Sequence, residues 1–265
     1  MVKQRADELL VARGLAESRN QAQRLVMAGQ VRADGQVVAK PSSLLAPEAA
    51  LVVDSGPRFV SRGGDKLAAA IEEFGVKLDG RVCADVGAST GGFTDCLLQQ
   101  GAAKVYAIDV GKGQLHWKLR QDPRVEVMEG TNARYVGKLP EPVDVVTIDA
   151  SFISLKTLLP VVRNWMAVKG ELLALIKPQF EAGKSQVGKG KGVIRDPQIH
   201  RQVLTEILAY AREQGFNVVG LTRSPLLGPK GNTEFLLWAN NSKATALDAG
   251  RFIEPLFENG KVDER

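Results

Sequence analysis

The fold is decided by one stretch in the first half of the chain, Val82-Cys83-Ala84-Asp85-Val86-Gly87-Ala88-Ser89-Thr90-Gly91-Gly92-Phe93. Its first five residues are mostly apolar, which is typical of a strand buried on both faces of a parallel sheet. The loop that follows is rich in glycine, which allows tight turns and a close approach of the backbone to a ligand. A helical pattern then runs from Phe93 to Gln100. This order predicts one unit of an α/β sheet with a ligand at the carboxyl end of the strand.

The same alternation continues along the chain. Short apolar runs predict further strands at 104–108, 125–128, 143–148, 172–176, 217–222 and 233–238. Helical patterns lie at 66–74, 155–165 and 197–214, and the last begins with the capping pair Asp196-Pro197. We therefore predict a doubly wound α/β fold.

The loop and the end of the second strand predict a nucleoside-containing cofactor. Asp109 ends that strand, where a carboxylate accepts hydrogen bonds from ribose hydroxyls. A dinucleotide requires glycine where Ser89 stands, so the loop favours S-adenosylmethionine, which has no pyrophosphate. Helix capping is the alternative for Ser89 and Thr90, and packing in the core is favoured for Phe93. The expected cofactor-binding residues are Asp85, Gly87, Ser89, Thr90, Gly91, Gly92, Phe93, Asp109, Glu129 and Asn132.

The first 55 residues predict a smaller α+β module. Helical patterns at 5–13 and 19–28 are separated by Gly14 and the N-cap candidate Ser18. The pair Asp34-Gly35 between short apolar runs predicts a hairpin. We expect the module at 1–55, a linker at 56–61, the α/β domain at 62–245 and a polar tail at 246–265.

The composition is typical of a soluble globular protein. The 265 residues are 44% hydrophobic and 25% charged, and 35 Lys+Arg against 30 Asp+Glu give a net charge of +5, which permits nucleic-acid binding without proving it. No run approaches the roughly 18 apolar residues of a membrane helix, and the N-terminus has no signal-peptide pattern, so we expect a cytoplasmic protein. Cys83 and Cys96 are too few for a disulfide framework or a metal site.

Three ring-bearing residues have no predicted function. His116 and His200 lack partners at a catalytic spacing, so both are expected on the surface. For Trp117, packing in the core is favoured over a role as a base-stacking platform.

The N-terminal module carries Ser18-Arg19-x-x-Ala22-x-x-Leu25-Val26-x-x-Gly29-x-Val31-x-x-Asp34-Gly35, followed by Lys40-Pro41. This pattern resembles the S4-type RNA-binding domain. The resemblance implies that Arg5, Arg19 and Arg24 face structured RNA, where guanidinium groups bind phosphate oxygens. Solvated surface charge is the alternative for each of them.

A basic, glycine-rich stretch runs from Phe180 to Arg195 and suits contact with a phosphate backbone. An ordinary solvated loop is the alternative. The further RNA-binding residues expected in the α/β domain are Arg62, Lys184, Lys189 and Lys191.

Four charged residues stand in separate motifs. Lys66 lies in Ser61-Arg62-Gly63-Gly64-Asp65-Lys66-Leu67, Asp149 and Lys177 end two strands, and Glu234 begins the last one. The set resembles the Lys-Asp-Lys-Glu tetrad of the FtsJ-like ribose 2′-O-methyltransferases. With the S4-like module, the chain to about residue 240 resembles the TlyA family, first labelled haemolysin. One departure is Asp65, where a neutral or aromatic residue is expected.

The resemblance implies a class I (Rossmann-like) methyltransferase sheet that uses S-adenosylmethionine and modifies a cytidine in ribosomal RNA. Members differ in whether one or both ribosomal subunits are modified. A lysine must lose its proton to take one from a ribose hydroxyl. Lys177 is the expected base or orienting group and Lys66 the neighbouring cation, with Asp149 and Glu234 holding the two ammonium groups.

Other classes of function remain open on the sequence. A non-catalytic ribosome-binding or assembly factor would keep the fold and lose the chemistry. A membrane-lytic protein would need an amphipathic or spanning segment, and none is visible. An NAD-dependent enzyme is disfavoured by Ser89 and Glu234. We expect ribosomal subunits as partners, no membrane and no metal; the sequence leaves the oligomeric state open, with a monomer slightly favoured.

Overall fold

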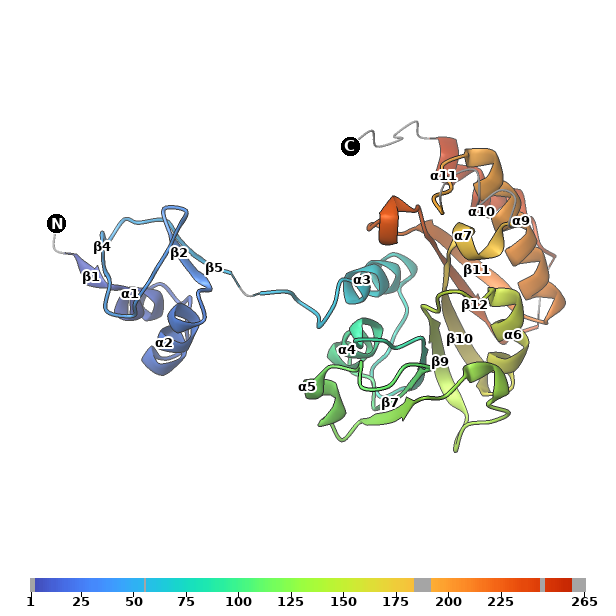
Figure 1. Ribbon diagram of the computed structural model, residues 1–265, viewed down its shortest axis with the longest axis horizontal. Helices are drawn as coiled ribbons and strands as arrows, with labels where there is room; N and C mark the ends of the chain where they lie inside the picture. The colour runs from blue at the N-terminus through green and yellow to red at the C-terminus, as the bar shows by residue number, and fades with distance from the viewer. Residues whose placement is uncertain (1–2, 55, 184–191, 244–245, 259–265) are drawn as a thin grey trace. The chain divides into compact units, whose positions relative to one another are not determined.

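The computed structural model describes residues 3–54, 56–183, 192–243 and 246–258. It divides the chain into two compact units, Met1–Arg58 and Phe59–Arg265 (Figure 1). The division falls inside the segment expected as a linker. Phe59 is buried in the second unit, where its ring packs against Gly64. The α/β unit therefore begins a few residues earlier than the sequence indicated.

The first unit packs two short helices against small antiparallel strands. Ser18 caps the second helix by accepting a hydrogen bond from the backbone N–H of Gln21 at 3.3 Å, and Asp34 and Gly35 turn the hairpin with positive φ. Strand β1 pairs with β4, and β3, β2 and β5 form a three-stranded sheet. The elements are β1 (Gln4–Arg5), α1 (Ala6–Ala12), α2 (Arg19–Met27), β2 (Val31–Ala33), β3 (Gln36–Val37), β4 (Leu44–Leu45) and β5 (Leu51–Val53).

The second unit is built on a seven-stranded sheet of order β11-β12-β10-β9-β6-β7-β8. Five of these strands run parallel, which confirms the predicted α/β class. Strand β12 is antiparallel to both of its neighbours, because no crossover helix separates it from β11. The strands are β6 (Val82–Val86), β7 (Lys104–Asp109), β8 (Val125–Glu129), β9 (Val143–Ile148), β10 (Met166–Ile176), β11 (Asn217–Arg223) and β12 (Phe235–Asn240).

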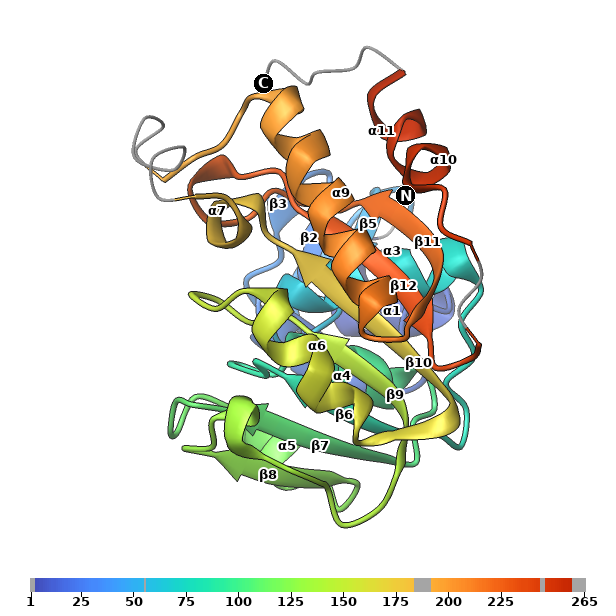
Figure 2. The ribbon, with the colours of Figure 1, turned by 90° about the vertical axis from the view of Figure 1, so that its right-hand side faces the viewer.

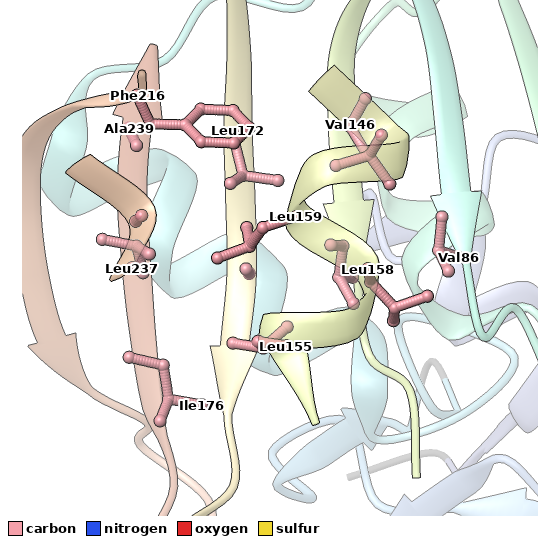
Figure 3. Close-up of a cluster of buried hydrophobic side chains, with 14 of the residues drawn as sticks. Val86, Val146, Leu155, Leu158, Leu159, Leu172, Ile176, Phe216, Leu237 and Ala239 are labelled. Atoms are coloured by element: carbon pink, nitrogen blue, oxygen red, sulfur yellow. The ribbon is translucent and has the colours of Figure 1, made fainter. Parts of the chain in front are cut away.

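Helices cover both faces of this sheet (Figure 2). Helices α3 and α4 pack on one face with Leu67 and Leu97, and α6 and α9 pack on the other. Figure 3 shows Leu155, Leu158 and Leu159 of α6 lying against the strands. The helical segments are α3 (Gly63–Phe74), α4 (Gly92–Gln99), α5 (Trp117–Arg120), η1 (Ala133–Tyr135), α6 (Leu155–Arg163), α7 (Pro178–Glu181), α9 (Pro197–Glu213), η2 (Pro229–Gly231), α10 (Ala249–Ile253) and α11 (Pro255–Glu258).

The expectation of a polar tail is wrong for the residues that form α10 and α11. Ile253 is buried in the core of the second unit, and the Phe257 ring lies 6.3 Å from that of Phe235. Arg201 of α9 sits over the Phe257 ring at 4.2 Å. A few apolar residues at helical spacing are enough to dock this segment, although its overall composition is polar.

Candidate active site

Three residues of the predicted tetrad line one cavity of about 450 Å³, here the first cavity. Lys66 reaches it from α3, Asp149 from the end of β9 and Lys177 from the end of β10. Glu234, just before β12, lies directly behind Lys66. The carboxyl ends of neighbouring parallel strands meet at one edge of the sheet, so residues far apart in sequence converge there.

The four side chains form two separate ion pairs. Lys66 Nζ lies 2.6 Å from Glu234 Oε2, and Lys177 Nζ lies 2.6 Å from Asp149 Oδ1. Lys177 Nζ also donates to Ser151 Oγ at 3.1 Å and to the Asp149 carbonyl oxygen at 3.5 Å. Both ammonium groups are nearly buried and are therefore held in one orientation at the cavity wall.

Glu234 is enclosed more tightly than its partner. The side chain is fully buried, and its Oε1 has no hydrogen-bond partner among the described residues. Gly228 lies against this oxygen, and a Cβ at position 228 would overlap it. Glycine at 228 is therefore required for Glu234 to point at Lys66.

A second cavity of about 580 Å³ adjoins the first. The two share the lining residues Gly87, Ser89, Asp149 and Ser151. A ligand in the second cavity therefore meets a ligand in the first beside the Asp149–Lys177 pair.

The glycine-rich loop shapes this junction. Gly87 has φ +85°, and a Cβ there would lie 2.7 Å from the Asp149 carbonyl oxygen. Gly91, with φ +97°, and Gly92 bring the start of α4 against its neighbours. Thr90, Gly92 and Phe93 line the first cavity, and Phe93 is also buried in the core, as predicted. A larger residue at 87 would push the loop away from the strand end.

The second cavity is lined by a carboxylate and an apolar wall, the groups that suit a nucleoside-containing ligand. Asp109 stands at the end of β7, and its carboxylate accepts from the backbone N–H groups of Ser89 at 2.8 Å and Gly111 at 2.7 Å. Each carboxylate oxygen keeps lone-pair capacity for a ribose hydroxyl. Asn132 lies nearby, and the apolar wall needed by a purine ring is formed by Ile108, Val110, Ile153 and Leu158.

Two residues that were predicted to contact the cofactor are engaged within the protein, and their cofactor contacts stay predictions. Asp85 is completely buried under the loop, where its carboxyl group accepts from Thr94 Oγ1 at 2.7 Å and Thr147 Oγ1 at 3.1 Å. Burial raises the pKa of this carboxyl to about 7, and the two hydroxyl donors oppose the shift. It lines neither cavity, so it shapes the loop from below.

Glu129 is likewise used within the protein. It accepts from the side chain of Arg120 at 2.5 Å and from the backbone N–H groups of Gly113, Gln114 and Leu115. These donors, Arg120 first, lower its pKa to about 2. Glu129 therefore fixes the 113–115 turn, and its contact with an adenine ring stays a prediction.

The predicted RNA-binding arginines of the first unit fall into two groups. Arg5 and Arg19 both contact buried Asp7, at 2.9 and 3.0 Å, so they also hold the fold together. Arg24 is exposed and makes no ion pair with the described residues. The sequence analysis missed Asp7, although an acidic residue inside an apolar helical pattern was a signal for it.

In the second unit, Arg62 is exposed and lines the first cavity. Lys184, Lys189 and Lys191 lie outside the described residues. The RNA-binding roles of all these cations stay predictions.

Two of the ring-bearing residues are not where they were expected. His200 is buried, with its Nε2 3.1 Å from the Ile194 carbonyl oxygen and its ring edge-on to Phe235. Trp117 is 66% exposed instead of buried. In both cases the direction of the side chain is set by helix packing that a single sequence does not display.

Ser151 is a site residue that the sequence analysis missed. It borders both cavities and accepts the hydrogen bond from Lys177. Phe152 beside it has φ +63° and is almost fully exposed on the wall of the second cavity. The available signal was their position directly after Asp149 at a strand end.

Comparison with known families identifies both units. The FtsJ-like methyltransferase family matches residues 59–241, and the S4 domain family matches residues 4–51. The chain is 49% identical over 251 residues to the 16S/23S rRNA (cytidine-2′-O)-methyltransferase TlyA of Mycobacterium tuberculosis, covering 92% of each protein. It is 41% identical over 235 residues to Hemolysin A of Brachyspira hyodysenteriae, covering 88% of this chain and 98% of that protein.

Solved structures agree with these matches. A hemolysin-named protein from Streptococcus thermophilus superposes with a TM-score of 0.73 at 42% identity, covering 97% of this chain and 94% of that one. An S-adenosylmethionine-dependent methyltransferase from Mesorhizobium loti, 13% identical, superposes with a TM-score of 0.51 over 67% of this chain and all of that one. The latter likeness concerns the fold alone.

Proposed function

The chain belongs to the FtsJ-like methyltransferase family, and we propose that it transfers a methyl group from S-adenosylmethionine to a ribose 2′-hydroxyl in ribosomal RNA. The observation that carries this proposal is the junction of the two cavities. A cavity with two lysine–carboxylate pairs opens beside a cavity suited to a nucleoside cofactor. Such a junction suits group transfer between two bound ligands.

Each side chain at the junction has a role in this proposal. Lys177 acts on the 2′-hydroxyl, as the base that takes its proton when neutral or as the donor that orients its oxygen when charged. Asp149 and Ser151 hold Lys177 Nζ in position. Lys66 is held by Glu234 and supplies a second positive charge, which reaches the cavity wall from helix α3. When bound, S-adenosylmethionine supplies the electrophilic methyl group on its sulfonium.

The substrate follows from the relatives and the first unit. The Mycobacterium tuberculosis relative is named for cytidine 2′-O-methylation in 16S and 23S rRNA. The S4 domain match and the exposed Arg24 support binding to structured RNA. We therefore infer a cytidine in a ribosomal subunit as the target, and the cytoplasm, where ribosomes are assembled, as the location.

The hemolysin names of some relatives make membrane lysis the second candidate activity. Across the described residues, no helix combines the length and the apolar character needed to span a bilayer. Leakage of liposomes loaded with a dye, measured with detergent-free protein, tests that activity directly.

The test of the proposed function uses labelled S-adenosylmethionine and unmodified 30S and 50S subunits, followed by digestion of the RNA and mass analysis of the nucleosides. We expect 2′-O-methylcytidine from the wild-type protein. Lys177→Ala should lose at least a thousandfold in rate while it still binds the cofactor, because the group that acts on the hydroxyl is gone. A protein that binds the cofactor and labels neither subunit would be an assembly factor or act on another RNA.

A further inference from the structure

The short helix α5 presents an aromatic ring to solvent at the edge of the active site. Leu115 and Leu119 are buried, and both side chains pack against Gly91. Trp117 lies midway between them in sequence, so the same turn directs its indole outward. The ring is 66% exposed, whereas Trp165 is buried and Trp238 is half-buried. Tryptophan is enriched at interfaces, because its ring is apolar while its N–H can donate a hydrogen bond.

Hydrogen bonding ties this helix to the first cavity. The backbone N–H of His116 donates to the carbonyl oxygen of Thr90 at 3.1 Å, and Thr90 lines the cavity. The His116 ring lies 5.8 Å from the Trp117 ring in a tilted arrangement. Because the backbone of His116 is bonded to the cavity wall, Trp117 directly follows a residue that is anchored beside the first cavity.

Cations complete the rim. On the other side of the glycine pair, the segment Ser61–Gly64 packs so closely on Gly92 that a Cβ there would overlap Ser61 Oγ. This packing places the exposed Arg62 on the wall of the first cavity. Lys118 is 61% exposed, and its Nζ is 3.9 Å from the nearly buried Asp95. An exposed aromatic ring with a cation next to it in sequence and another on the nearby cavity wall suits an unpaired base and its adjoining phosphates.

We propose that Trp117 is a stacking platform for an unpaired nucleobase next to the methylated nucleotide, with Arg62 and Lys118 on the adjoining phosphates. This inference rests on the proposed function for the identity of the RNA, but the stacking itself is measurable without methyl transfer. A single-stranded segment is required, because bases inside a duplex do not expose a face.

The first test uses the fluorescence of Trp117. Since Trp165 is buried and the Trp238 indole donates to Glu171 at 2.8 Å, acrylamide should quench mainly Trp117 in the free protein. A short single-stranded RNA oligonucleotide should change this emission and protect it from acrylamide, and the same sequence as a duplex should not. Trp117→Phe should abolish the response, and Trp238→Phe should retain it.

The second test measures methyl transfer to ribosomal subunits. Trp117→Ala should lower kcat/KM for the subunit about tenfold, since one stacked base is at stake. Trp117→Phe, which keeps an aromatic face, should remain within about threefold, and the cofactor affinity should be unchanged in both.

Two results would overturn the proposal. Acrylamide that fails to reach Trp117 in the free protein would mean that another part of the chain or a second copy covers it. Wild-type kcat/KM in Trp117→Ala would exclude a role in RNA binding. If the wild-type protein methylates neither subunit, the proposed function fails, while the fluorescence response still decides whether Trp117 stacks on RNA.

Discussion

Asp7 in the first unit and Asp85 in the second are both completely buried, yet their surroundings drive their ionisation in opposite directions. Asp7 receives charged donors from Arg5 and Arg19 and an amide donor from Gln23, all at about 3 Å. Hydrogen bonds from Arg5 contribute most to holding the pKa of Asp7 well below its usual range. Asp85 receives two threonine hydroxyls and the backbone N–H of Thr94, all uncharged donors, so burial dominates and raises its pKa to about 7.

The difference teaches that burial alone does not determine the charge of a carboxyl group. Where arginines supply charge, the carboxylate is a fixed anion that organises the surface around it. Where only uncharged groups supply hydrogen bonds, the buried carboxyl group holds its proton up to about neutral pH. In the first unit a buried carboxylate holds Arg5 and Arg19 in place, and in the second a buried carboxyl group supports the glycine-rich loop.

The largest expected effect is the pH dependence contributed by Asp85. Its folded pKa of about 7 exceeds the unfolded value of 3.8, so the folded state binds the extra proton between these values. The stability of the second unit should therefore fall as pH rises from about 4 to 7 and then level off. A pKa difference of about three between the folded and unfolded states changes the free energy of unfolding by at most about 4 kcal/mol. Urea unfolding across this range, comparing wild type with Asp85→Asn, measures it.

The Asp85→Asn variant should lose this slope and be the more stable protein at pH 8. Asp65→Asn, a change at an exposed position of the same unit, should keep the wild-type slope. Identical slopes in wild type and Asp85→Asn would contradict the raised pKa.

Removal of Asp7 should destabilise the first unit by about 3 kcal/mol, because Arg5 and Arg19 would lose their shared counter-ion. Hydrogen exchange of Asp7→Ala should show faster exchange in α1 and α2 and unchanged exchange in the second unit. Glu8→Ala removes an exposed partner of the same arginines and should cost less than about 1 kcal/mol. Unchanged protection of α1 in Asp7→Ala would show that Asp7 is not the organising anion.

A third buried carboxylate, Glu234, sharpens the comparison, because within the part of the chain that the structure describes only one of its carboxylate oxygens has a hydrogen-bond partner. Gly228→Ala adds a methyl group where Glu234 Oε1 lies and should displace the Lys66–Glu234 pair. We expect a loss of about 100-fold in methyl-transfer rate, because small misplacements of catalytic groups cost that much. Cofactor affinity, measured by calorimetry, should hardly change.

The matched control is Gly137→Ala, since no atom lies within 4 Å of a Cβ at that position and its φ is ordinary. A Gly228→Ala enzyme with wild-type rate would mean that the position of Glu234 is not needed for the reaction.

The smallest effect is expected for Arg24, which lies on the first unit but outside the Asp7 network. Arg24→Ala should weaken binding to ribosomal subunits a few-fold and lower the salt dependence by about one charge. Its unfolding curve should match that of the wild type. Arg19→Ala should instead lower both subunit binding and stability, because Arg19 also holds Asp7. An equal loss of unfolding free energy in Arg24→Ala and Arg19→Ala would show that the two arginines contribute equally to the stability of the first unit.

Local pattern was enough to predict the class of the protein. The short apolar runs identified all seven strands of the large sheet, since strands buried on both faces must be continuously apolar. The motifs around Lys66, Asp149, Lys177 and Glu234 identified the family, because each motif is contiguous in sequence.

Tertiary structure alone decided which groups face one another. Lys66 pairs with Glu234 across 168 positions, and Asp85, at a strand end like Asp109, is covered while Asp109 borders a cavity. For the same reason Trp117, which was expected in the core, is exposed, and His200, which was expected on the surface, is buried. Pattern determines which residues enter helices and strands, because that depends on neighbours along the chain. Exposure, pKa and ion pairing depend on neighbours in space, which only the packed fold brings together.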